Sequence, residues 1–168
     1  MESEKDKSIQ RVYHATKKYN LKTIQEEGLE ARVGARSEFA RDVGYGEEEK
    51  KPIICVMDNL EEAIKWTGGL HKPNRDESEQ LVILSFELDG TEKIIHRREN
   101  YEGAEHVLTD DCLVAPERLF LLKINKNNQV IGEKRLTEME IPEYYRQIME
   151  EKKKEEDKRW QEIRKDIQ

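Results

Sequence analysis

The sequence has few of the residues that cross-link a chain or fill a large core. Of its 168 residues, only two are cysteine and four are proline, while aromatic residues make up 7% and hydrophobic residues 35%. Cys55 and Cys112 lie far apart without metal-ligand spacing, which favours reduced thiols in a cytoplasmic protein. No run of about 18 apolar residues exists, so we predict no membrane span. The first eight residues are too polar for a secretory signal.

Charged residues are abundant instead. They make up 40% of the chain, with 30 Lys and Arg against 37 Asp and Glu, and the formal net charge is −7. An acidic protein attracts nucleic acid weakly, because phosphates need a basic face. The charge therefore argues against a nucleic-acid partner, although it leaves room for a local basic patch.

A length of 168 residues fits one domain with an appendage.

The stretch that begins with Val12 and Tyr13 has the densest set of structural and chemical signals. These two residues favour a strand, and His14 and Thr16 are the first side chains near its end that can do chemistry. A helix is expected over 21–27, with an asparagine before it as the cap and a glycine after it in the left-handed conformation. A polar group at the end of a strand, supported by a short helix, is a common way to build a site.

Further strands and one more helix are expected downstream. The apolar run 52–57 predicts a buried strand, and Asp58 is expected to cap the next helix with Glu61 as its capping-box partner. Trp66 in that helix is expected to pack against the core. The other predicted strands span residues 80–88, 93–95, 105–108, 118–124 and 130–131.

Two connections carry specific expectations. Asp89-Gly90 is a strong signal for a two-residue hairpin turn, so we expect it to join two antiparallel strands. The stretch 29–51 contains glycines between charges and shows no clear period, which indicates either a functional loop or partial disorder. Tyr45 lies in this stretch and is a candidate lid residue over a ligand.

The composition changes near residue 140. Pro142 fits the first turn of a helix that runs to the end of the chain, and residues 150–159 are all charged. Apolar residues near the two ends of this helix fall close to one face. It is therefore either a packing helix with a solvated shaft or a helix that binds a protein partner. The predicted organisation is a flexible tail 1–10, a domain 11–132 and a charged helix 140–168.

Three motifs follow one another along the chain: Tyr13-His14-Ala15-Thr16 with the later Gly28-Leu29, then Ile53 to Asp58, then Glu105 to Thr109 followed by Leu113 to Leu119. In this order they resemble the ADP-ribosyltransferase superfamily, which includes poly-ADP-ribose polymerases, diphtheria-type toxins and RNA 2′-phosphotransferases. The resemblance implies an α+β fold with a split antiparallel β-sheet core, short helices and, outside the family pattern, the long C-terminal helix. On the second strand the family often has tyrosine or histidine, where this chain has Cys55.

The resemblance implies an NAD-dependent ADP-ribosyltransferase that moves ADP-ribose from NAD to a macromolecular or small-molecule target. His14 would bond the adenine-side ribose of NAD, with Ala15 and Thr16 beside it, and Glu105 would be the catalytic carboxylate. Such a carboxylate stabilises the positive charge that develops on the ribose as nicotinamide leaves. His14 and Glu105 are thus the expected active-site pair, and no metal is expected.

Arg97 is a further candidate for binding the cofactor. It belongs to the run His96-Arg97-Arg98, which suits a phosphate because guanidinium groups fork onto phosphate oxygens. A solvated strand end is the alternative interpretation of this run. Two alternative functions also stay open: a non-enzymatic nucleotide- or partner-binding protein on the same fold, and an RNA 2′-phosphotransferase, which the acidic charge disfavours.

Overall fold

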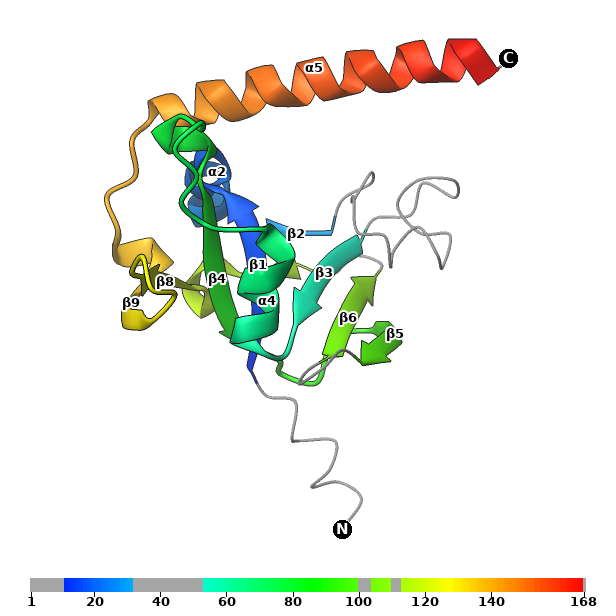
Figure 1. Cartoon of the computed structure of the whole chain (residues 1–168). Coiled ribbons are helices and arrows are strands. Elements are labelled where there is room, and N and C mark those ends of the chain that lie inside the picture. Colours follow the sequence, from blue (N-terminus) through cyan, green and yellow to red (C-terminus); the bar gives the residue numbers. More distant parts are fainter. Residues whose placement is uncertain (1–10, 32–52, 100–103, 110–112, 168) are drawn as a thin grey trace.

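The computed structural model describes residues 11–31, 53–99, 104–109 and 113–167, so the predicted tail 1–10 and Tyr45 lie outside the described residues. The predicted α+β class is confirmed. Within the described residues, a seven-stranded sheet is accompanied by a two-stranded sheet and by helices (Figure 1). No helix in these ranges is long and apolar enough to cross a membrane.

Every neighbouring pair of strands in the large sheet is antiparallel, in the order β5-β6-β3-β1-β4-β8-β9. Its strands are β1 (Arg11–Lys17), β3 (Ile53–Met57), β4 (Leu81–Glu87), β5 (Ile94–Glu99), β6 (Ala104–Thr109), β8 (Phe120–Ile124) and β9 (Val130–Arg135). The small sheet joins β2 (Leu29–Glu30) to β7 (Leu113–Val114). The helices are α2 (Leu21–Glu27), α4 (Leu60–Thr67) and α5 (Tyr144–Ile167).

Strand β1 pairs fully with its neighbour on one side of the large sheet and at a single position with its neighbour on the other side. It pairs with β4 along its whole length, from Arg11 opposite Glu87 to Lys17 opposite Leu81. With β3 it shares a single registered pair, Tyr13 opposite Met57. The sheet therefore consists of β5-β6-β3 on one side and β1-β4-β8-β9 on the other, joined at one residue pair.

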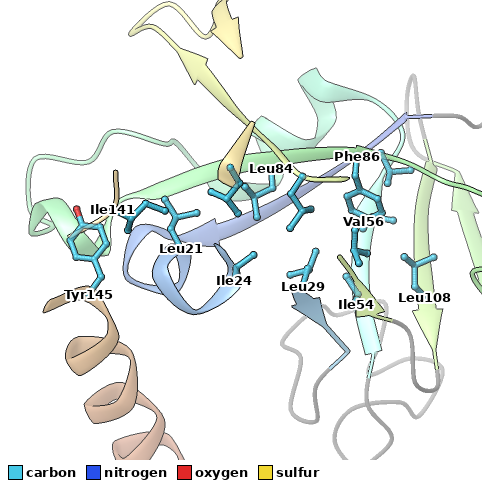
Figure 2. Close-up of a cluster of buried hydrophobic side chains, with 14 residues drawn as sticks. Leu21, Ile24, Leu29, Ile54, Val56, Leu84, Phe86, Leu108, Ile141 and Tyr145 are labelled. Carbon is cyan, nitrogen blue, oxygen red and sulfur yellow. The ribbon is translucent and has the colours of Figure 1, made fainter. Parts of the chain in front are cut away.

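The larger hydrophobic core lies on the face of the sheet that is covered by α2, the small sheet and the start of α5. Figure 2 shows it as a continuous band of side chains from Tyr145 at one end to Leu108 at the other. Its members are Val12, Leu21, Ile24, Leu29, Ile54, Val56, Leu84, Phe86, Leu108, Val114, Leu119, Leu136, Ile141 and Tyr145.

A smaller core lies on the opposite face, under α4. Helix α4 contributes Ala63 and Ile64 to this core, and both are buried. Trp66 points away from it and is 45% exposed, so the prediction that Trp66 packs in the core is wrong. The reason is helical geometry, because residues two positions apart lie on different faces of a helix.

Gly28 ends α2 and sends the chain directly into β2. Its φ angle is 90° and its ψ angle is 177°, so the predicted positive φ is present but in an extended conformation. A Cβ atom at this position would lie 2.6 Å from the carbonyl oxygen of Val114. Only glycine permits this approach, which lets Leu29 pair with Val114 and become buried.

The predicted hairpin at Asp89-Gly90 is wrong, because β6, β3 and β1 lie between β4 and β5 in the sheet. The Asp89 carboxylate accepts a hydrogen bond from the Thr91 amide at 2.9 Å. The Glu92 carboxylate accepts from the amides of Asp89 and Gly90, and Arg118 donates to Glu92 at 2.8 Å. These side chains satisfy the backbone amides of the turn. Because β1 and β8 already occupy both edges of β4, β5 cannot pair with β4.

The predicted cap of α4 also needs correction. The N-cap is Asn59, whose side-chain oxygen accepts from the Glu62 amide at 3.0 Å. Asp58 lies one residue earlier, and its carboxylate is engaged by His106 instead. Asparagine and aspartate are equally good caps, so the local signal did not distinguish the two adjacent residues.

The predicted long C-terminal helix is confirmed as α5, and its first turn belongs to the core. Leu136 is fully buried, and Ile141 and Tyr145 are 9% and 7% exposed. Because β9 runs to Arg135 and is followed by these residues, the packed unit continues beyond residue 132. Farther along, α5 extends away from the sheet, as Figure 1 shows.

Candidate functional site

The candidate site lies where pairing between β1 and β3 stops. The Nδ1 atom of His14 is 2.8 Å from the carbonyl oxygen of Cys55, one residue past the Tyr13–Met57 pair. A carbonyl oxygen can only accept, so Nδ1 carries the hydrogen and, in the neutral ring, Nε2 is the acceptor. The imidazole thus spans the split between the two halves of the sheet in a fixed orientation.

Thr16 and Ala15 lie on opposite faces of β1. Thr16 is 8% exposed, and its hydroxyl oxygen accepts a hydrogen bond from the Asn20 side chain at 2.9 Å. Asn20 occupies the predicted N-cap position of α2 but makes no side-chain capping bond. Ala15 packs against the smaller core under α4. The structure therefore places Thr16 on the same face as His14 and Ala15 on the other.

Glu105 lies two strands away from His14, on β6. Its backbone is registered with Met57, which in turn is registered with Tyr13. Neighbouring strands are about 4.8 Å apart, so Glu105 and Tyr13 are separated by about 10 Å across the sheet. His14 follows Tyr13 on β1 and therefore belongs to the adjacent row, which faces the other side of the sheet. The register thus places Glu105 in the row of Tyr13 and Met57 and does not bring the predicted active-site pair into one row.

A β-bulge decides which arginine on β5 joins the row of Glu105. If the pairing of Ile94 with Leu108 continued without interruption, Arg97 would lie opposite Glu105. The register shifts between residues 94 and 96, so Arg98 is opposite Glu105 and Arg97 is opposite His106. The predicted cofactor residue Arg97 is therefore one register position away from Glu105 and shares the row of His106.

Sequence reasoning missed one buried polar pair next to this row. His106 is fully buried, and its Nε2 atom lies 3.3 Å from Oδ2 of Asp58, whose side chain is 20% exposed. His106 is registered with Val56, so the pair ties β6 to the corner at which β3 leads into α4. The signal available in the sequence was His106 itself, which directly follows the predicted catalytic residue Glu105.

The described residues show no gathering of three or more His, Cys, Asp or Glu side chains that could hold a metal ion. Comparison of the chain with protein-family models, with curated proteins and with solved structures found no match. The chemistry of the site therefore rests on the arrangement itself. The structure places an imidazole of fixed orientation at the split, and it places Glu105 two strands away in a different register row.

Proposed function

We propose that this chain is an NAD-dependent ADP-ribosyltransferase with an ADP-ribosyltransferase-like fold, and that NAD binds at the split between β1 and β3. One observation carries the proposal: the His14 imidazole bonds the Cys55 carbonyl where the strands separate. The role of Glu105 is the one that the resemblance implies. The resemblance of the motifs around these residues to the superfamily supports the same reading.

His14 would bind the ribose on the adenine side. Its Nδ1 bond to the Cys55 carbonyl sets the ring orientation, and Nε2 of the neutral ring can accept a hydrogen bond from a ribose hydroxyl. The backbone beneath it is rigid, because β1 is paired with β4 at every residue from Arg11 to Lys17. Rigid support of this kind holds a binding group in position before the ligand arrives.

Glu105 would act on the other ribose. The bond between C1′ and the nicotinamide nitrogen breaks, its electron pair leaves with nicotinamide, and positive charge develops on the sugar. A carboxylate that bonds a hydroxyl of this ribose stabilises the charge. The acceptor then attacks C1′ and releases its proton, so that the ADP-ribosyl group is transferred.

The test is nicotinamide release from NAD by the full chain and by Glu105→Gln. Loss of a preorganised electrostatic contact costs about 3–4 kcal/mol, or a few hundred-fold in rate. NAD affinity should change little, because the charge develops mainly in the transition state. Glu99→Gln is the matched control, since it removes one carboxylate from the neighbouring strand β5 at a different register position. Equal release by Glu105→Gln and the unmutated chain would contradict the proposal.

A second candidate function is non-enzymatic nucleotide binding on the same fold. The observation that favours it is Cys55, a half-buried residue at the position where the family often has an aromatic or histidine side chain. Without that ring, nicotinamide has no stacking partner at this position. Calorimetry that detects NAD binding to the unmutated chain, together with no nicotinamide release, would select this candidate.

A further inference from the structure

One side of helix α5 packs against the rest of the chain, and the other side is exposed. On the inner side Tyr145 is buried, and two turns later Lys152 is half-buried and forms an ion pair of 3.1 Å with Glu79. Residues three and four positions apart share one face of a helix. By this spacing the opposite side, here called the outer face, consists of exposed residues only, namely Gln147, Glu151, Lys154, Glu155, Lys158 and Glu162.

The charged segment 150–159 of α5 has an antisymmetric order of charges about the peptide bond between Lys154 and Glu155. At each step away from this bond, the residue on one side is opposite in charge to the residue on the other side. The mirrored pairs are Lys154 and Glu155, Lys153 and Glu156, Lys152 and Asp157, Glu151 and Lys158, and Glu150 and Arg159. Such a segment is complementary in charge to a second copy of itself that runs in the opposite direction.

The outer face retains this complementarity, because its charged positions are mirror pairs. In an antiparallel pair of helices centred on the same bond, Glu151 meets Lys158 of the second copy and Lys154 meets Glu155 of the second copy. Each contact occurs twice, since a two-fold interface is formed by the same residues of both copies. A parallel pair would instead bring Lys154 against Lys154, so repulsion between like charges disfavours it.

The way α5 is attached to the sheet is compatible with this pairing. Tyr145 belongs to the larger core, so the sheet of each copy lies on the inner side of its own α5. Two helices joined by their outer faces therefore keep the two sheets on opposite sides of the pair. Beyond its first turns α5 extends away from the sheet (Figure 1), so the central charged segment is the part that a second helix would meet.

We propose that the outer face of α5 binds a second copy of this chain as an antiparallel helix pair. Complementary charges along paired helices determine the partner and its orientation. Exposed ion pairs are individually weak and are screened by salt, so the association is reversible and sensitive to salt. This surface lies outside the split of the sheet, and the pairing does not depend on the proposed transferase activity.

The test is sedimentation equilibrium of the full chain between about 10 μM and about 1 mM, a range that detects weak association. At low salt we expect the weight-average mass to rise with concentration from that of one chain toward that of two. The affinity should fall at least about tenfold between about 50 mM and about 500 mM NaCl. The mass of a single chain at every concentration in low salt would overturn the proposal.

Two charge-reversed variants distinguish contacts between copies from ion pairs within one helix. Lys154→Glu/Lys158→Glu makes positions 151, 154, 155 and 158 all acidic, and Glu151→Lys/Glu155→Lys makes them all basic. Each variant alone should be monomeric, whereas an equimolar mixture should form a mixed dimer, because every contact again joins opposite charges. Ion pairs within one helix cannot produce this rescue. A mixture no heavier than its separate components would therefore contradict the antiparallel pairing.

The matched control is Lys153→Glu/Arg159→Glu, which makes the same change in net charge at exposed positions off the outer face. It should weaken self-association by at most about threefold, whereas Lys154→Glu/Lys158→Glu should weaken it at least about tenfold. Equal losses in the two variants would mean that net charge, and not the outer face, controls association, and would also overturn the proposal.

Discussion

Replacing Gly28 by alanine should destabilise the protein more than any ordinary exposed substitution. The residue has a φ angle of 90°, and the added Cβ atom would lie 2.6 Å from the Val114 carbonyl oxygen. The nearest side-chain atom is Leu113 Cδ1 at 3.1 Å. Because the closest contact is backbone, relief requires β2 and β7 to move apart, which disturbs the burial of Leu29.

Two separate costs add at this position. A non-glycine residue at a φ of 90° and a ψ of 177°, a region essentially restricted to glycine, costs about 1–3 kcal/mol. Relief of an overpacked contact costs about 1–3 kcal/mol more. We therefore expect Gly28→Ala to lower the free energy of unfolding by about 3 kcal/mol. For a chain of this length that corresponds to a fall in Tm of about 6–12 °C.

Gly90→Ala is the matched control, because Gly90 has the same φ angle of 90° but nothing within 4 Å of its added Cβ atom. It should show the backbone cost alone, about 1–2 kcal/mol. Urea denaturation followed by circular dichroism measures both free energies. If Gly28→Ala and Gly90→Ala lose equal stability, the close approach to Val114 is not what requires glycine at position 28.

Three further predictions follow from burial, charge and register. Leu136→Ala, at a fully buried position, should cost about 2–5 kcal/mol in chemical denaturation, and a neutral effect would place the core boundary before residue 136. Hydrogen bonds from Thr91 and the positive charge of Arg118 lower the pKa of Asp89 to about 2. The ionised Asp89 carboxylate therefore stabilises the fold fully above its pKa in the unfolded chain, about 3.9, and this stabilisation is lost as pH falls toward 2. Asp89→Asn should remove that acid-side dependence, which pH-dependent melts measure. In nicotinamide-release assays Arg98→Ala should shift the acid limb of the pH–rate profile more than Arg97→Ala, since Arg98 is opposite Glu105; equal profiles would contradict the register argument.

The sequence predicted individual strands and helices better than it predicted which strands pair with each other. The apolar run at 52–57 and the pattern around Val12 correctly indicated strands, because burial and β-propensity are local properties. The turn at Asp89-Gly90 was also recognised, but the pairing assigned to it was wrong. Pairing depends on competition among distant strands, and β1 and β8 occupy the edges of β4 that a hairpin would have needed.

The candidate site shows the same limit at the level of single residues. The motif at His14 led directly to the split of the sheet. The position of Arg97 depended on a bulge after Ile94, which shifts the register by one residue and has no clear signature in the sequence. Asp58 resembled a helix cap, whereas its partner His106 is 48 residues away and is brought to it only by the pairing of β3 with β6.

The single pair between β1 and β3 also determines how the molecule deforms. Resistance to bending across a sheet comes from its ladder of cross-strand bonds, and between β1 and β4 that ladder covers seven consecutive pairs. Between β1 and β3 it is reduced to Tyr13 and Met57, supplemented by the His14 side chain. The large sheet therefore consists of two stiff parts with one compliant line between them, and a change in the angle between these parts would break few cross-strand hydrogen bonds.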